Sequence, residues 1–215
     1  PCEDQSRLVK ALKQIETYQW LVFTSPTGVR IFFKEMDKQH MDIRKLGQVR
    51  LAVIGSGTAK ELEKRGLYPD LVPEEFYGEA LGKALAEKCN DGDHILIPRA
   101  SIGNQELVQI LTEKRKAAID DIPTYDTIYA GSVLIDEKQE FENGSIDYAV
   151  FTSASTVKGF AEATKGLDYT KVHAVCIGRQ TKAAADALGM RTEMSEKATM
   201  DSVVEKVAEL CQKQD

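Results

Sequence analysis

The chain has 215 residues, of which 42% are hydrophobic, and its 34 Asp and Glu side chains outnumber its 28 Lys and Arg, so the formal net charge is −6. These values are typical of a globular protein and argue against a basic nucleic-acid-binding surface, a disordered chain or a coiled coil. The apolar runs are far shorter than the roughly 18 residues of a membrane span, and no export signal is visible. We therefore expect a cytoplasmic protein with one large domain or two small ones.

Neither the cysteines nor the histidines have the spacing of a metal site. The four cysteines are widely separated: Cys2, Cys89, Cys176 and Cys211. No pair has CxxC spacing, which argues against a zinc knuckle or a disulfide framework and favours reduced thiols. His40, His94 and His173 are equally scattered, and we expect them in surface or packing roles. No metal ligands are predicted.

Short apolar runs alternate with amphipathic patterns along the whole chain. The runs mostly lack charges, which is typical of strands buried on both faces of a parallel sheet. We predict strands at residues 20–24, 51–54, 94–98, 117–122, 148–152, 172–177 and 191–194. Helical spacing of apolar residues predicts helices at residues 7–17, 27–38, 58–65, 78–88, 104–115, 156–165, 181–188 and 200–212. This alternation predicts an α/β fold with parallel sheets and right-handed crossovers.

Two motifs occur twice, in the same order and at nearly the same displacement. FTSPTGV at residues 23–29 reappears as FTSASTV at residues 151–157. IGSGTA at residues 54–59 is matched by IGRQTK at residues 177–182, and each is followed by a glycine, Gly66 and Gly189. The repeat predicts two copies of one α/β unit.

The two copies differ in extent. We predict a first complete lobe at residues 1–124, an interlobe linker at residues 125–133 and a second lobe at residues 134–215. The second lobe has no counterpart of the last two strands of the first. A sheet short of two strands would leave open backbone donors and acceptors, so we expect a longer parent polypeptide in which a strand–helix–strand segment precedes Pro1.

The repeated FTS motif ends a strand and opens a helix. In open α/β sheets, ligands bind at the carboxyl ends of strands, where a helix start presents unpaired N–H groups and the positive end of its dipole. Thr24, Ser25, Thr152 and Ser153 are suited to cap these helices and to donate to an anion. Simple capping is the alternative for each of them.

The second repeated motif also follows a strand and opens a helix, with Thr58 and Thr181 as the expected capping residues. It contains neither GxGxxG nor a Walker loop, so it gives no nucleotide fingerprint. Tyr125 falls where the first lobe ends. A tyrosine at that crossing is either hinge packing or a proton donor that lines a cleft.

In chain order, the segments FTSPTGV, AVIGSGTAKELEKRG, ILIPRA, TYDT, DYAVFTSASTVKGF and CIGRQTKAAADALG resemble the uroporphyrinogen-III synthase family. The resemblance covers nearly the whole chain. It implies two flavodoxin-like lobes joined by a two-stranded linker, with an N-terminal strand–helix–strand that completes the second lobe.

The resemblance also implies an activity, a substrate and a set of site residues. The enzyme would be a lyase that converts hydroxymethylbilane, a linear tetrapyrrole with eight carboxylates, into uroporphyrinogen III, with loss of water and inversion of the last pyrrole ring. No cofactor is implied. The family's cleft Thr and Ser positions fall on Thr24, Ser25, Thr58, Ser153 and Thr181, and its cleft tyrosine falls on Tyr125 as the proton donor. We expect a monomer that binds neither nucleic acid nor membrane, either alone or fused to another tetrapyrrole-synthesis enzyme.

Two alternatives stay open at this point. The first is a non-catalytic two-lobed protein that closes on an anionic small ligand. The second is a nucleotide-dependent enzyme with paired α/β lobes, such as a glycosyltransferase. The second needs a phosphate-binding glycine loop or a pair of metal-binding carboxylates, and neither is evident in the sequence.

Overall fold

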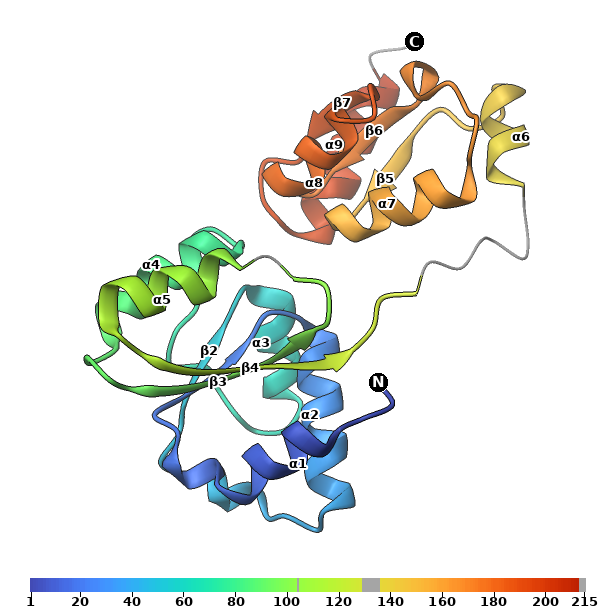
Figure 1. Cartoon of the computed structure of the whole chain (residues 1–215). Coiled ribbons are helices and arrows are strands. Elements are labelled where there is room, and N and C mark those ends of the chain that lie inside the picture. The colour runs from blue at the N-terminus through green and yellow to red at the C-terminus, as the bar shows by residue number, and fades with distance from the viewer. Residues whose placement is uncertain (104, 129–135, 213–215) are drawn as a thin grey trace. The chain divides into compact units, whose positions relative to one another are not determined.

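The computed structural model describes residues 1–103, 105–128 and 136–212. It divides into two compact units, Pro1–Thr127 and Ile128–Asp215 (Figure 1). Most of the predicted linker at residues 125–133 lies outside the described residues, so its extent stays a prediction.

The described residues of the first unit form four parallel strands and the helices that cover them. Its elements are α1 (Ser6–Lys13), η1 (Ile15–Thr17), β1 (Trp20–Phe23), α2 (Pro26–Lys38), η2 (Ile43–Leu46), β2 (Arg50–Val53), α3 (Ser56–Glu63), α4 (Gly78–Lys88), β3 (His94–Ala100), α5 (Glu106–Arg115) and β4 (Ala118–Tyr125). The strand order is β2-β1-β3-β4. The chain therefore winds outward in both directions from β1, and the switch point where ligands bind in such sheets lies between β1 and β3.

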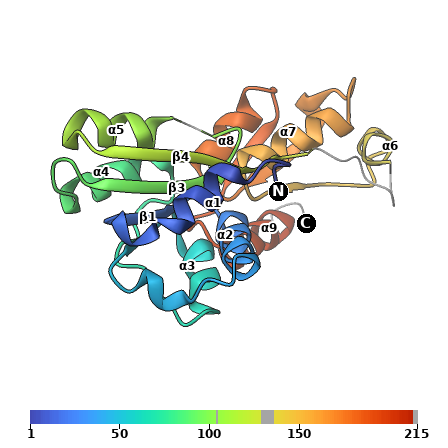
Figure 2. The same ribbon diagram turned by 60° about the horizontal axis from the view of Figure 1, so that its bottom comes forward.

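Each face of this sheet has its own core. Leu21 and Phe23 of β1 point to the face covered by α1, α2 and α3, where Phe32 and Leu62 are fully buried. Trp20 and the other alternate residues point to the opposite face, under α4 and α5. Figure 1 shows α4 and α5 on one side of β3 and β4, and Figure 2 shows these two strands running side by side. Burial on both faces explains why the strands read as continuous apolar runs.

The second unit is smaller. Its elements are α6 (Glu137–Glu142), β5 (Ala149–Phe151), α7 (Ala154–Ala163), η3 (Tyr169–Lys171), β6 (His173–Cys176), α8 (Arg179–Asp186), β7 (Arg191–Met194) and α9 (Met200–Gln212). The three strands are parallel in the order β5-β6-β7. Phe151 and Val157 belong to the core on the α7 and α8 face, whereas Val175 and Val203 pack together on the α9 face.

The sequence repeat corresponds to a repeat of backbone geometry. Ser25 has φ −163° and ψ 153°, and Ser153 has φ −165° and ψ 160°. Both serines are the N-caps of the helices that follow them. Gly66 and Gly189 both have positive φ, 73° and 82°, at the end of the next helix in each copy. Two copies of one α/β unit are thus present.

The predicted α/β fold with parallel sheets is confirmed, and each predicted strand and helix has its counterpart in the structure. Helix α6 was not predicted, because its six residues bury only Phe141 and show no helical period. Boundaries differ by a few residues. In particular, the four helices that follow the repeated motifs begin one or two residues earlier than predicted.

Candidate active site

The loops at the carboxyl edge of the first sheet lie next to one another. A β-carbon added to Gly28, in the first turn of α2, would lie 3.1 Å from the Pro98 carbonyl oxygen of β3. One added to Gly57, at the start of α3, would lie 4.0 Å from the Pro26 side chain. The starts of α2 and α3 and the end of β3 therefore form one continuous edge at the switch point of the sheet.

Ser25 and Tyr125 meet at this edge. The hydroxyl oxygens of the two residues are 2.6 Å apart, and either group can donate. Ser25 also accepts a hydrogen bond of 2.9 Å from the Gly28 backbone N–H, as the N-cap of α2. Tyr125 is the last residue of β4, and both side chains are partly exposed. A phenol and a serine hydroxyl thus form a hydrogen-bonded pair at the positive end of a helix dipole.

Thr24 and Thr152 each precede the capping serine of their copy. Thr24 is partly buried and Thr152 is exposed. Ser153 caps α7 by accepting from the Thr156 N–H at 3.2 Å, and the Thr156 hydroxyl accepts from the Ser153 N–H in return. This reciprocal pair is a capping box. Among the described residues, the hydrogen bonds of the Ser153 side chain stay within α7 and include a hydroxyl contact of 2.8 Å with Ser155.

The prediction that Thr58 and Thr181 cap their helices is wrong. The N-caps are Gly55 and Gly178, both with extended backbones and without a side-chain capping bond. Each helix starts directly after its glycine, so the threonine is the third helical residue and its side chain is turned inward, with 2% and 4% exposure. Of the four helix starts that follow the repeated motifs, two carry hydroxyl caps, at Ser25 and Ser153.

An ion pair between the buried Arg99 and the partly exposed Asp121 was not predicted from the sequence. The Arg99 guanidinium binds both carboxylate oxygens of Asp121, at 2.7 and 2.6 Å, across the β3–β4 pair. The Arg99 side chain is only 6% exposed. It also fills the space beside Gly103 in the loop after β3, where an added β-carbon would lie 3.0 Å from Nη1. The feature of the sequence that could have indicated this ion pair is Arg99, a charged residue within the otherwise apolar segment ILIPRA.

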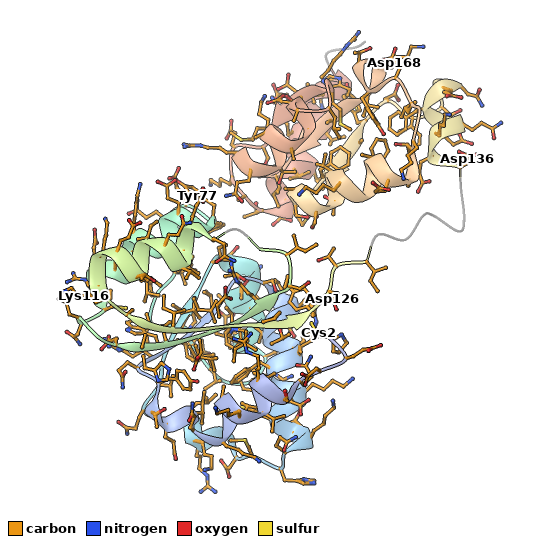
Figure 3. The ribbon with its side chains drawn as sticks, in the orientation of Figure 1. Cys2, Tyr77, Lys116, Asp126, Asp136 and Asp168 are labelled. Carbon is orange, nitrogen blue, oxygen red and sulfur yellow. The ribbon has the colours of Figure 1, made fainter. Side chains whose placement is uncertain are left out.

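Further polar groups surround the end of β4. The Ser101 hydroxyl donates to Asp126 at 2.6 Å. Figure 3 shows Cys2 and Asp126 close together just beyond β4. Burial and the neighbouring Asp126 carboxylate raise the pKa of the Cys2 thiol. The N-terminal segment thus packs against the end of the strand that carries Tyr125.

An aromatic side chain covers the start of α3. Phe76 lies against Gly55, so closely that an added β-carbon would be 2.8 Å from the Phe76 Cγ atom. The equivalent Gly178 of the second copy has open space at the same position. Phe76 itself keeps 38% of its surface exposed. The two copies of the motif therefore differ in what covers their glycine caps.

Two of the histidines lie at the amino ends of strands in their own units. His94 begins β3, where its Nε2 is 3.1 Å from Asp120, and its ring packs against Tyr18. His173 begins β6 and packs against Tyr148. In the described part of the chain, His, Cys, Asp and Glu form no group of three or more that could hold a metal ion. None of the described helices has the length and apolar character needed to cross a membrane.

The strand order and the repeat define a class of protein. Its members have two α/β units with parallel sheets, and helices with polar first residues start at the carboxyl edges of these sheets. Within this class, the sequence model of the family described as "Uroporphyrinogen-III synthase HemD" matches residues 1–205. The chain belongs to the uroporphyrinogen-III synthase family.

Individual relatives agree with this assignment. The chain is 34% identical over 210 residues to "Porphyrin biosynthesis protein HemD" of Ruminiclostridium josui, a match that covers 98% of this chain and 42% of that protein. It is 24% identical over 180 residues to "Uroporphyrinogen-III synthase" of Chlorobaculum parvum, covering 81% of this chain and 72% of the relative. The chain thus spans less than half the length of the Ruminiclostridium protein.

Solved structures with this fold carry the same family name. The uroporphyrinogen III synthase of Thermus thermophilus, as a triple mutant, superposes with a TM-score of 0.64 at 18% identity, covering 95% of this chain and 83% of that one. The Helicobacter pylori uroporphyrinogen-III synthetase gives 0.60 at 20% identity, covering 98% and 87%. At these identities the likeness concerns the fold.

Proposed function

We propose that this chain is a uroporphyrinogen-III synthase, a lyase that cyclises hydroxymethylbilane with loss of water and inversion of the last pyrrole ring. Membership of the family supports the activity. The observation that carries the mechanism is the 2.6 Å pair of Ser25 and Tyr125 at the switch point of the first sheet.

Tyr125 is the proposed proton donor. A phenol carries its proton at neutral pH, so it can protonate the hydroxyl of the substrate as the bond between that oxygen and the hydroxymethyl carbon breaks. The oxygen leaves as water, and the carbon becomes the electrophile that a pyrrole carbon of the last ring attacks. Proton transfer leaves a phenolate on Tyr125, and the proton that the last ring loses as the macrocycle closes returns to this phenolate. The Ser25 hydroxyl can donate to this phenolate, and the Gly28 N–H behind it orients the serine oxygen.

Substrate binding must be local, because the protein carries a net charge of −6 and the proposed substrate has eight carboxylates. We propose the hydroxyl groups of Thr24, Ser25, Thr152 and Ser153 as binding positions, together with the helix starts that contain the buried Thr58 and Thr181. The glycine-capped starts of α3 and α8 have no side-chain cap, so their first N–H groups suit a carboxylate. Each such contact contributes roughly 0.3–1 kcal/mol, so several must act together.

Product analysis tests the proposal. Hydroxymethylbilane is incubated with the protein, the products are oxidised to porphyrins, and the type I and type III isomers are separated by chromatography. We expect mainly the type III isomer, whereas heat-unfolded protein should give the type I isomer that forms spontaneously. Type I alone with the folded protein would contradict the proposed function.

A further inference from the structure

The register between β3 and β4 changes just before Tyr125. From His94 and Ala118 to Arg99 and Pro123 the two strands pair residue by residue, and then Ala100 pairs with Tyr125. Thr124 is the extra residue of β4, so this position is a β-bulge. A bulge re-aims the side chains that follow it, because one extra residue reverses the alternation of faces.

The bulge decides which face Tyr125 takes. Ile122 belongs to the core on the α1, α2 and α3 face. In a regular strand Tyr125, three residues later, would lie on the opposite face, under α4 and α5. Instead, its hydroxyl reaches Ser25 at the start of α2. The pair of hydroxyls therefore depends on the extra residue at position 124.

Thr124 is held by both its side chain and its backbone. It is fully buried, and its hydroxyl donates to the Arg99 carbonyl oxygen at 3.2 Å. Its own carbonyl oxygen accepts from the Cys2 N–H and from the Gln5 side-chain amide, each at 3.0 Å. The next carbonyl, that of Tyr125, accepts from the Ser101 N–H at 2.8 Å.

The strand segment before the bulge is fixed as well. The two-pronged ion pair of Arg99 with Asp121 joins β3 to β4 on the α4 and α5 face, three residues ahead of Thr124. Bidentate pairing fixes orientation in addition to distance. The bulge therefore follows a part of β4 that the ion pair holds against β3. The register change occurs at Thr124.

We propose that Thr124 is a positioning residue, whose buried hydroxyl, bonded to the Arg99 carbonyl, fixes the bulge that aims the Tyr125 hydroxyl at Ser25. The catalytic consequence rests on the proposed function, whereas the placement of Tyr125 can be measured without it. Threonine suits this position because its hydroxyl binds the Arg99 carbonyl oxygen while the whole side chain is buried.

Three variants test the proposal. Thr124→Val keeps the shape and removes the hydroxyl, Thr124→Ser keeps the hydroxyl, and Thr164→Val is the matched control. Thr164 is also fully buried and donates to a carbonyl oxygen, that of Phe160, but in the second unit. The protein is labelled with 3-fluorotyrosine, and the fluorine resonance of Tyr125 is assigned by its loss in Tyr125→Phe. Ser25→Ala gives the shift expected when the hydroxyl pair is broken.

We expect Thr124→Val to move the Tyr125 resonance as Ser25→Ala does. It should lower kcat for type III product about 100-fold, the order of effect of a misplacement of about 1 Å, with KM changed less than about twofold. Thr124→Ser should restore both the resonance and kcat. Thr164→Val should lower the melting temperature but leave the resonance and kcat unchanged.

An unmoved Tyr125 resonance in folded Thr124→Val would overturn the proposal, as would a Thr124→Ser variant no better than Thr124→Val. If Thr124→Val does not fold, Gln5→Ala takes its place, because it removes one of the two donors to the Thr124 carbonyl; the same resonance must then shift. Absence of type III product from the unmodified protein would refute the proposed function alone, since the resonance still decides the placement of Tyr125.

Discussion

The Ser25 oxygen serves two partners. It caps the start of α2 by accepting a hydrogen bond from the Gly28 N–H, and it lies at hydrogen-bond distance from the Tyr125 hydroxyl. Its counterpart Ser153 caps its helix within a capping box, and its other hydroxyl contact among the described residues is with Ser155. The proposed role of Tyr125 as a proton donor requires that the anion it leaves is stabilised, and the contact with Ser25 would supply this stabilisation.

Replacement of Tyr125 by phenylalanine should separate catalysis from folding. We expect kcat for type III product to fall by roughly 10²–10⁴-fold, the usual contribution of a positioned general acid, with a melting temperature close to that of the unmodified protein. Steady-state kinetics and thermal unfolding measure the two effects. Tyr68→Phe is the control, since Tyr68 is 73% exposed in the loop after α3. Unchanged kcat in Tyr125→Phe would remove this residue from the mechanism.

The limits of sequence-based prediction are clear at this scale. Of the four residues that the FTS motifs indicated as caps, Ser25 and Ser153 are the caps, whereas Thr24 and Thr152 precede them without capping. The same reasoning failed for Thr58 and Thr181, where a glycine caps the helix and the threonine is buried. Local preference allows either residue as the cap, and tertiary packing decides between them. The Ser25–Tyr125 contact joins residues 100 positions apart, so no local pattern could predict it.

At the scale of elements, the strands and helices were predictable because burial on both faces of a sheet and on one face of a helix imposes distinct periods. The bulge at Thr124 was not. Nothing in Pro123, Thr124 and Tyr125 by themselves specifies a register change, which arises from pairing with β3 and from contacts with Cys2 and Gln5. A strand predicted to end at residue 122 instead continues to Tyr125 and carries the candidate proton donor.

The repeat supplies a matched pair of variants at the starts of α3 and α8. Gly55→Ala should destabilise the protein by about 1–3 kcal/mol, since its β-carbon would overlap the inner atoms of Phe76. Gly178→Ala should change the free energy of unfolding by less than about 0.5 kcal/mol, because its β-carbon would meet open space and both backbones are extended. Urea denaturation measures both values. Equal values for the two variants would mean that Phe76 moves away from the added β-carbon without a loss in the free energy of unfolding.

For the whole molecule, we expect Tyr18 to make the free energy of unfolding depend on pH in the alkaline range. This side chain is 1% exposed and donates its hydroxyl proton to Asp120. Burial, followed by the hydrogen bond to Asp120, raises the pKa of Tyr18 to about 12 from the usual value of 10. The folded protein thus holds a proton that the unfolded chain releases above pH 10, so this contribution to stability is complete below pH 10 and is lost as the pH rises to 12.

We therefore expect the free energy of unfolding to fall between pH 10 and 12 more steeply in the unmodified protein than in Tyr18→Phe. Urea titrations at pH 9, 10, 11 and 12, followed by circular dichroism, measure the two curves. Tyr169→Phe serves as the control, because the Tyr169 hydroxyl donates to the Ala161 carbonyl and not to a carboxylate. Parallel curves for the unmodified protein and Tyr18→Phe would assign the alkaline loss to other groups.

Because the Ser25 oxygen both caps α2 and contacts Tyr125, substitutions at this position that raise thermal stability also affect the hydroxyl pair. Aspartate is at least as good a helix cap as serine, and its charge suits the start of α2, so a thermostability screen has a physical reason to select Ser25→Asp. The same carboxylate would stand beside the Tyr125 hydroxyl and oppose the negative charge that the proposed proton donation would leave there. Heat tolerance and turnover therefore pull in opposite directions at this one position, and directed evolution for either property should be scored on both.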